Sequence, residues 1–317
     1  MLKRPHARLA LLGLITLVAC AVFLFAFLPN RWQYALHYRT LGFIAIVLSG
    51  TAIAVATLVF YTLANNRILT PSILGLDALY VLLYTTVVFA FGSQALLAVG
   101  ALGQFVVATV LMLLFAFALY HFMLKGEQPN LYFLLLVGII CGTFFHSLAL
   151  FMEVLIDPNE FQIIQDVNFA SINNVNREIL PLAAVLVVLP CVYVFRQLPV
   201  LNVLSLGRDQ AITLGVDYAK LSKRLLLVVA LLTSVATALI GPVMFLGLLV
   251  MNLTFEFMQH QRYQTLMPAC ILITLSALLG GQFLISQVLN FSTTITVVIN
   301  FVGGIYFIYL LLRRNLA

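Results

Sequence analysis

The sequence has 317 residues, of which 63% are hydrophobic and only 8% charged, and its mean hydropathy is +1.13. Soluble domains carry roughly 25% charged residues, so this composition excludes a water-soluble protein and indicates a polytopic membrane protein embedded in lipid. The formal net charge of +6 does not indicate nucleic-acid binding, because the basic residues occur singly or in small groups near the ends of apolar segments.

The apolar segments are each about 20 residues long, which is the length that an α-helix needs to cross a bilayer. A β-barrel would instead show short segments of alternating polarity. We therefore expect an all-α fold with a single transmembrane domain, residues 1–317. The first span has no cleavage pattern of a signal peptide, so we expect it to be retained. Ten spans are predicted, at residues 9–28, 40–63, 72–91, within 98–124, and at 131–155, 179–195, 225–240, 243–257, 266–287 and 294–312.

Basic residues set the orientation of these spans, because cytoplasmic loops are enriched in Lys and Arg. With ten spans both termini lie on one side of the membrane. If that side is the cytoplasm, all but three of the sixteen lysines and arginines are inside. The exceptions are Arg31, Arg39 and Arg177. We therefore expect both termini in the cytoplasm and the chain in the inner (cytoplasmic) membrane.

The sequence shows no motif of an enzyme or a metal centre. It has no nucleotide-binding P-loop, no hydrolase nucleophile motif and no zinc-protease motif. Its four cysteines each lie within an apolar segment and form no C-x-x-C pair, which is typical of buried thiols. No catalytic residue, metal ligand or cofactor is predicted, and any ATP hydrolysis is expected on another polypeptide.

The segment between the sixth and seventh predicted spans, residues 204–216, is expected to form a short cytoplasmic helix bounded by glycines. Gly207 and Gly215 flank a helix-forming stretch, and glycine permits sharp turns at both of its ends. An ordinary charged loop that obeys the positive-inside rule is the alternative. A structured, charged segment of this kind is expected of a surface against which another protein pushes.

The same region resembles a known family of permeases. Its pattern L-S-L-G-x-x-x-A-x-x-L-G-V is followed by a basic stretch, a long apolar helix and G-P-x-x-F-x-G-L. This arrangement resembles the FecCD-like permeases of binding-protein-dependent ABC importers. The matching residues are Leu206, Gly207, Ala211, Leu214, Gly215, Gly241, Pro242, Phe245, Gly247 and Leu248.

The resemblance implies a permease subunit that works with a separate ATPase subunit, a solute-binding protein and a second permease subunit, with a heterodimer favoured over a homodimer. It also implies that the ATPase docks on a coupling helix in the cytoplasm. The implied coupling residues are Leu206, Gly207, Arg208, Asp209, Ala211, Leu214 and Gly215. Turns such as ILGLDALY and NFASINN are similar to those of permeases for catechol-type siderophores, including enterobactin, vibriobactin, anguibactin and petrobactin. A ferric siderophore is therefore the expected solute in transit.

Two further site predictions concern the outer face. Relatives carry a basic residue near the start of the second span that holds carboxylates of the binding protein, which points to Arg39 and, by proximity, to Arg31. An arginine that snorkels to lipid headgroups is the alternative. The second prediction concerns a set of polar residues that matches the family region beside the translocation path. A plain extracellular loop is the alternative. The members of the set are Asn168, Ser171, Asn173 and Asn174.

The sequence departs from the family pattern in two places. The segment Asn66–Gly75 matches the family's turn only in part, and an acidic residue, Asp77, follows it at or inside an apolar span. An intramembrane acid is a functional hypothesis by default, whereas a solvated side chain or pairing with Arg67 would give it a structural role. Near the end of the eighth span, the positions at which the family commonly has Pro, His and Arg are occupied by Met251, Asn252 and Phe255.

Two other functions stay open at this point. Haem or cobalamin is carried by other permeases of this kind. A proton-coupled secondary transporter using Asp77, Glu153 or Glu256 would be a different class of protein, and its uptake would persist without an ATPase.

Overall fold

The chain is all-helical in the part that the computed structural model describes, residues 5–26, 32–66, 69–123, 131–168, 172, 175–259, 262–289 and 293–315. No β-strand occurs among these residues, so the expectation of an all-α fold is confirmed. The α-helices are α1 (Pro5–Phe25), α2 (Trp32–Ala64), α3 (Leu76–Phe91), α4 (Ser93–Met123), α5 (Leu131–Leu155), α6 (Pro158–Asn168), α7 (Ile179–Arg196), α8 (Leu198–Leu204), α9 (Arg208–Thr213), α10 (Tyr218–Ile240), α11 (Met244–Met258), α12 (Tyr263–Gln287) and α13 (Ile295–Asn315). A 3₁₀ helix, η1 (Pro71–Leu74), precedes α3.

Seven of the helices are long and apolar enough to cross a membrane, namely α1, α2, α4, α5, α7, α10 and α12. Three shorter apolar segments, in α3, α11 and α13, correspond to the remaining predicted spans. The chain is therefore a multi-pass membrane protein.

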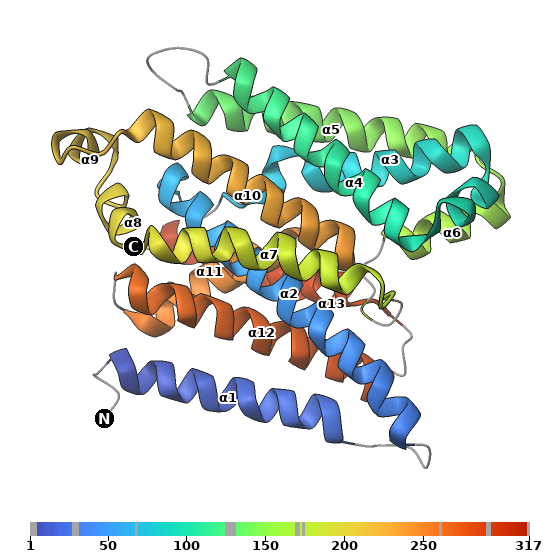
Figure 1. Cartoon of the computed structure of the whole chain (residues 1–317), viewed down its shortest axis with the longest axis horizontal. Helices are drawn as coiled ribbons and strands as arrows, with labels where there is room; N and C mark the ends of the chain where they lie inside the picture. Colours follow the sequence, from blue (N-terminus) through green and yellow to red (C-terminus); the bar gives the residue numbers. More distant parts are fainter. Residues whose placement is uncertain are drawn as a thin grey trace.

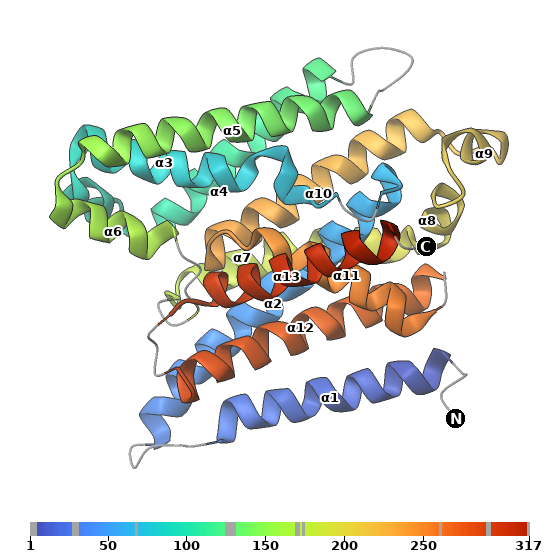
Figure 2. The same ribbon diagram turned by 180° about the vertical axis from the view of Figure 1, so that it is seen from behind.

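The long helices run roughly side by side along the molecule (Figure 1). Helices α3, α4 and α5 form one group, and α1 lies at the opposite margin (Figures 1 and 2). Between them, α2 packs against α7, α10, α11 and α12. Its side chains Ile46, Leu58 and Phe60 are fully buried. Helix α2 is thus the centre of the core.

The outer surface of the bundle is strongly apolar. On α5, Phe144, Phe151 and Val154 are 61%, 63% and 84% exposed. If this surface faced water it would be unfavourable, because exposed apolar area costs about 25 cal/mol per Å². Such apolar faces suit contact with the hydrocarbon of a bilayer.

Two predicted boundaries are wrong for the same physical reason. The second span was expected from residue 40, yet α2 already begins at Trp32. The seventh span was expected from Leu225, yet α10 begins at Tyr218. Both stretches contain polar residues but no proline or glycine, and polarity alone does not end a helix. These helices extend beyond the apolar length.

Two other boundaries depend on glycine. The third span was expected from Ser72, but η1 ends at Gly75, whose φ of +81° turns the chain before α3 starts. The fourth span was expected within residues 98–124, but α4 already starts at Ser93 and is kinked at Gly100, which has φ 68° and ψ 161°. Glycine reaches these conformations without the steric cost that a side chain would add.

The two ends of the helical bundle differ. The beginning of α1, the end of α13 and the short helices α8 and α9 all lie at one end (Figures 1 and 2). At that end Arg8 donates to the carbonyl oxygens of Phe257 and Met258, at 2.7 and 3.0 Å. The two chain ends are therefore on the same side as the predicted coupling segment.

Candidate functional site

The predicted coupling segment follows a helix that is firmly attached to the bundle. In α8, Leu201 is fully buried, and the side-chain oxygen of Asn202 accepts a hydrogen bond of 3.0 Å from the backbone N–H of Tyr263 at the start of α12. The hydroxyl of Tyr263 in turn accepts a hydrogen bond of 2.8 Å from Thr62 of α2. Helix α8 thus ties the segment to two of the core helices.

Helix α9 follows α8 in the chain and lies between two glycines, as the sequence predicts. Gly207 has φ +103° and Gly215 has φ +84°, both in the region that favours glycine. After α9 the N–H of Gly215 donates to the carbonyl of Ile212, and the N–H of Val216 donates to that of Ala211. These bonds satisfy carbonyls that a helix end leaves unpaired. The glycines therefore fix the direction in which α9 projects.

One face of this short helix is buried, and exposed apolar side chains lie within the helix, at Ile212, and beside its two ends, at Leu206 and Leu214. Ala211 is fully buried, whereas Leu206, Ile212 and Leu214 are 55%, 49% and 62% exposed. Figure 1 places α9 at the extreme end of the bundle, apart from the long spans. Leucine and isoleucine side chains presented at such a tip are typical of a surface for another protein.

Charged groups surround the apolar tip. Asp217 caps α10: its carboxylate accepts a hydrogen bond of 3.2 Å from the Lys220 N–H and forms an ion pair of 2.9 Å with the Lys220 side chain. The Lys220 side chain holds the pKa of the Asp217 carboxyl below its ordinary value. The guanidinium of Arg208 lies 5.9 Å from the ring centroid of Tyr218. The cation–π contact joins α9 to α10, and the Asp217 cap starts α10.

Helix α10 leads directly from the tip into the core. It is 23 residues long, and its residues Val229, Ala230, Leu232 and Val235 are fully buried. It packs against α2, α4, α7 and α3. At its far end Gly241, with φ +92°, breaks the helix before α11. Helix α10 therefore connects the region of α9 with several of the long helices.

The structure describes one of the two predicted outer arginines, Arg39. Arg39 is half-buried and donates to the carbonyl oxygens of Phe23, Leu24 and Ala26 at 3.2, 3.4 and 2.6 Å. These carbonyls belong to the end of α1, so the guanidinium caps that helix. Arg31 lies outside the described residues.

The predicted polar group near the path is mostly outside the described residues. Asn168 is the last residue of α6, and its side chain is not described; Ser171, Asn173 and Asn174 are not described at all. Ile172, within the same stretch, is buried, and its carbonyl oxygen would lie 3.4 Å from a Cβ built on Gly42 of α2. Ile172 therefore lies against the central helix.

The positions that depart from the family pattern pack within the bundle. Met251 is buried, and the Asn252 amide donates a hydrogen bond of 2.8 Å to the carbonyl oxygen of Leu248. The ring of Phe255 lies 4.9 Å from that of Tyr61. Glu256, the neighbouring acid, accepts a hydrogen bond of 3.4 Å from Tyr306. These contacts give the departures a packing role.

Sequence reasoning missed a close approach of backbones between α5 and η1. A Cβ added to Gly142 would lie 3.1 Å from the Cα of Gly75, and one added to Gly138 would lie 3.0 Å from the Cα of Leu74. Gly138 and Gly142 form a G-x-x-x-G pattern, which allows helices to approach closely in membranes. This pattern was the available signal.

The structure also corrects the predicted surroundings of Asp77. The side chain is only 3% exposed, and it accepts a hydrogen bond of 2.8 Å from Thr237 of α10. It is therefore not solvated. Arg67, the partner suggested by the sequence, lies outside the described residues.

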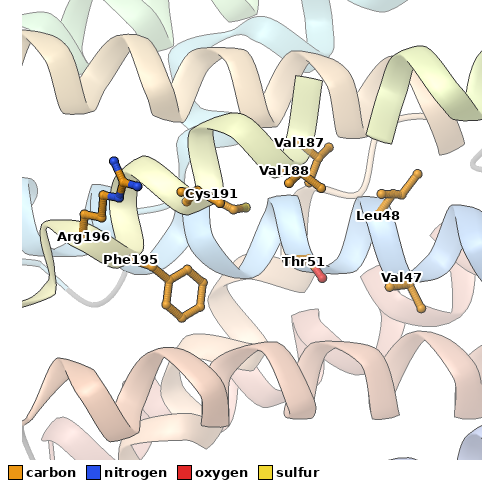
Figure 3. A pocket seen from close by; sticks show the side chains of 9 residues that line it. Val47, Leu48, Thr51, Val187, Val188, Cys191, Phe195 and Arg196 are labelled. Carbon is orange, nitrogen blue, oxygen red and sulfur yellow. The ribbon is translucent and has the colours of Figure 1, made fainter. Parts of the chain in front are cut away.

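A groove of about 480 Å³ lies between α2 and α7 (Figure 3). Its walls are apolar except for Thr51 and Arg196, and none of the predicted site residues lines it. Figure 3 shows Val187, Val188 and Cys191 of α7 opposite Leu48 and Thr51 of α2. Such a groove suits lipid chains or another helix, and it offers few polar groups to a charged solute.

Comparisons with known proteins agree with this geometry. The FecCD transport family matches residues 9–313. The chain is 51% identical over 312 residues to the petrobactin import system permease protein YclO of Bacillus subtilis (strain 168), covering 98% of this chain and 99% of that protein. It is 34% identical over 277 residues to the petrobactin import system permease protein FatC of Bacillus anthracis, covering 87% and 78%.

A solved structure described as an inward-facing conformation of a metal-chelate type ABC transporter has the same fold. It superposes with a TM-score of 0.83 at 19% identity, and the match covers 97% of this chain and 99% of that one. At this identity the likeness concerns the fold alone.

Proposed function

The chain belongs to the FecCD transport family, and from this membership we propose that it is the permease subunit of an ABC importer that takes up ferric siderophores. The 51% identity to the YclO permease over nearly the whole of both chains carries this proposal. Petrobactin is named for both similar permeases, so a siderophore of that chemistry is the first solute to test. Energy would come from a separate ATPase subunit.

We place ten spans in the inner (cytoplasmic) membrane, with both termini inside. The seven long apolar helices and the three shorter ones account for the count. Since the chain ends lie at the same end of the bundle as α9, an even number of spans fits (Figures 1 and 2). Lys220, Lys223 and Arg224 follow α9, and their positive charge favours the cytoplasm.

We infer that the ATPase docks on α9. The exposed Leu206, Ile212 and Leu214 supply an apolar contact, and the neighbouring Arg208 and Asp209 supply charge around it. Apolar groups in the centre of a contact with polar groups at its rim are usual for protein interfaces. Movement of the ATPase subunits would then turn α10 and change access to the path.

On the outer face, Arg39 and Arg31 are proposed to receive carboxylates of a solute-binding protein. Charge pairs of this kind set the rate and register of docking more than the affinity. The path between two permease subunits, with a heterodimer favoured, would pass the polar residues Asn168, Ser171, Asn173 and Asn174. Their amide and hydroxyl groups would hydrate a large chelate without binding its iron.

A charge-reversal exchange tests the role of Arg39. Arg39→Glu, and separately the opposite reversal of a glutamate on the binding protein, are each expected to lower uptake, and the double reversal is expected to restore part of it. Restoration would be incomplete, because Arg39 also caps α1. Arg39→Lys is the control: it keeps the charge and should preserve docking while lowering thermal stability. A double reversal no better than the single ones would remove Arg39 from the docking site.

Uptake of radiolabelled iron tests the proposed function as a whole. Cells lacking this gene are expected to lose uptake of iron supplied as a petrobactin-type chelate, and to keep uptake from hydroxamate and citrate chelates. The wild-type gene should restore it. Haem and cobalamin serve as further solutes, and loss of only one of these would replace the siderophore assignment. Uptake that survives loss of the ATPase but not of the proton gradient would indicate a secondary transporter.

A further inference from the structure

A small polar cavity lies where two interruptions of the helical bundle meet. One interruption is η1 with Gly75, before α3, and the other is Gly241 with Pro242, between α10 and α11. The cavity holds about 20 Å³ and is lined in part by residues of both interruptions, Pro71 and Gly241. A volume of this size accommodates one particle as large as a water molecule. Irregular backbone at membrane depth is tolerated where it lines such a cavity.

Oxygen atoms dominate the polar side chains of this cavity. The carboxylate of Asp77 shares it with five hydroxyl side chains, those of Thr57, Thr70, Ser72, Thr233 and Thr237. Oδ1 of Asp77 accepts the 2.8 Å hydrogen bond from Thr237. Oδ2 is buried and has no hydrogen-bond partner among the described residues. One carboxylate oxygen is thus satisfied, and the other is available to a ligand.

An ionised Asp77 would need a ligand of opposite charge close by. The carboxylate is in the first turn of α3, where the helix dipole favours a negative charge, and Thr237 donates a hydrogen bond to it. These contacts stabilise the ionised form. A buried ionised group nevertheless costs several kcal/mol unless a charge of opposite sign is close. No salt bridge to Asp77 occurs among the residues that the structure describes.

We propose that the cavity at Asp77 binds a single monovalent cation of the size of Na⁺. The ion would contact Oδ2 and hydroxyl oxygens of the threonine and serine side chains. Carbonyl oxygens at the end of α10 lie at the same break, and unwound helix ends of this kind coordinate Na⁺ in transporters. A divalent ion is disfavoured, because the single carboxylate of the cavity would neutralise only one of its two charges.

The proposed ion would also connect two moving parts. Asp77 belongs to α3, whereas Thr233 and Thr237 belong to α10, which starts next to α9. Occupancy would hold the far end of α10 against α3. The inference does not require that the solute is a siderophore, because it depends only on the cavity.

Equilibrium binding of radiolabelled Na⁺ to the purified full-length chain in nanodiscs tests the site. We expect saturable binding of about one ion per chain, competed by Li⁺ and not by choline. Asp77→Asn should lower binding at least tenfold, because the amide has the same shape without the charge. Thr57→Val removes one hydroxyl at nearly constant shape and should weaken binding severalfold. Asp157→Asn removes an exposed acid and should leave binding unchanged.

Three results would overturn the proposal. Equal Na⁺ binding by the wild type and Asp77→Asn would place the ion elsewhere. A second contrary result is that no Na⁺ binds at any pH and that the infrared spectrum shows a protonated carboxyl, which Asp77→Asn removes. Asp77 would then carry a proton and not bind an ion. Na⁺ binding that appears only in Arg67→Gln would identify Arg67 as the counter-charge. Folding of each variant is checked by size-exclusion chromatography, and Thr57→Val keeps the test decisive if Asp77→Asn does not fold.

Discussion

Gly215→Val is expected to lower siderophore uptake about tenfold or more while the protein stays in the membrane. Gly215 has φ +84°, and no atom lies within 4 Å of a Cβ built there, so the added side chain meets open space. The cost is conformational: a side chain in the left-handed region is disfavoured by roughly 1–2 kcal/mol, and more for a β-branched residue. The turn would relax, and α9 would no longer project in the direction that docking requires.

Gly215→Asn separates this cause from others. Asparagine tolerates the left-handed region far better than valine does and is also larger than glycine. It should therefore retain most of the uptake, whereas valine does not. Membrane fractionation and co-purification of the ATPase give the other readouts: Gly215→Val should be present in normal amount and should bind less ATPase. Uptake equal to that of the wild type in Gly215→Val would remove α9 from the coupling pathway.

A second variant reaches the same segment by packing. Ala211 is fully buried on the inner face of α9, so Ala211→Phe would force the helix away from the bundle. Its neighbour Thr213 is exposed, and Thr213→Phe serves as the control of equal size. Loss of uptake in the first variant and not in the second is the expected result.

The short helix between two glycines could be predicted because its signals are local. Glycines at 207 and 215 require positive φ, and the residues between them form one short helix, which are properties of consecutive residues. The apolar spans are similarly local, since each is read from a continuous segment. Their ends were less predictable, because α2 and α10 continue into polar sequence that has no helix-breaking residue.

The contacts that join the helices could not be predicted in the same way. Asp77 and Thr237 are 160 residues apart, and nothing near either residue specifies the other. Arg39 has the charge expected of a docking residue, yet its capping of α1 depends on how the first two helices pack. The G-x-x-x-G pattern of α5 was visible in the sequence, but its partner is an irregular segment that no helical periodicity reveals.

That irregular segment gives the largest expected effect on stability. At Gly75 an added Cβ would lie 2.9 Å from both the Cα and the backbone N of Gly142, closer than packed atoms allow. The φ of +81° adds a conformational cost of about 1–2 kcal/mol. Overpacking adds about 1–3 kcal/mol, because the obstructing atoms belong to the backbone and cannot rotate away. Gly75→Ala should therefore strongly lower the thermal stability of the purified protein.

Two controls isolate the contributions to this loss. Gly215→Ala carries a similar positive φ, +84°, in open space, so it should show the conformational cost without the clash. Within regular helix, Gly142→Ala brings a Cβ to 3.1 Å from the Cα of Gly75, whereas Gly280→Ala meets no atom within 4 Å. Alanine is a better helix former than glycine by about 1 kcal/mol, so Gly280→Ala should raise stability and Gly142→Ala should lower it. If both changes raised stability, α5 and η1 would not be in close contact. The start of α3, which carries Asp77, would then be held in place by something other than this contact.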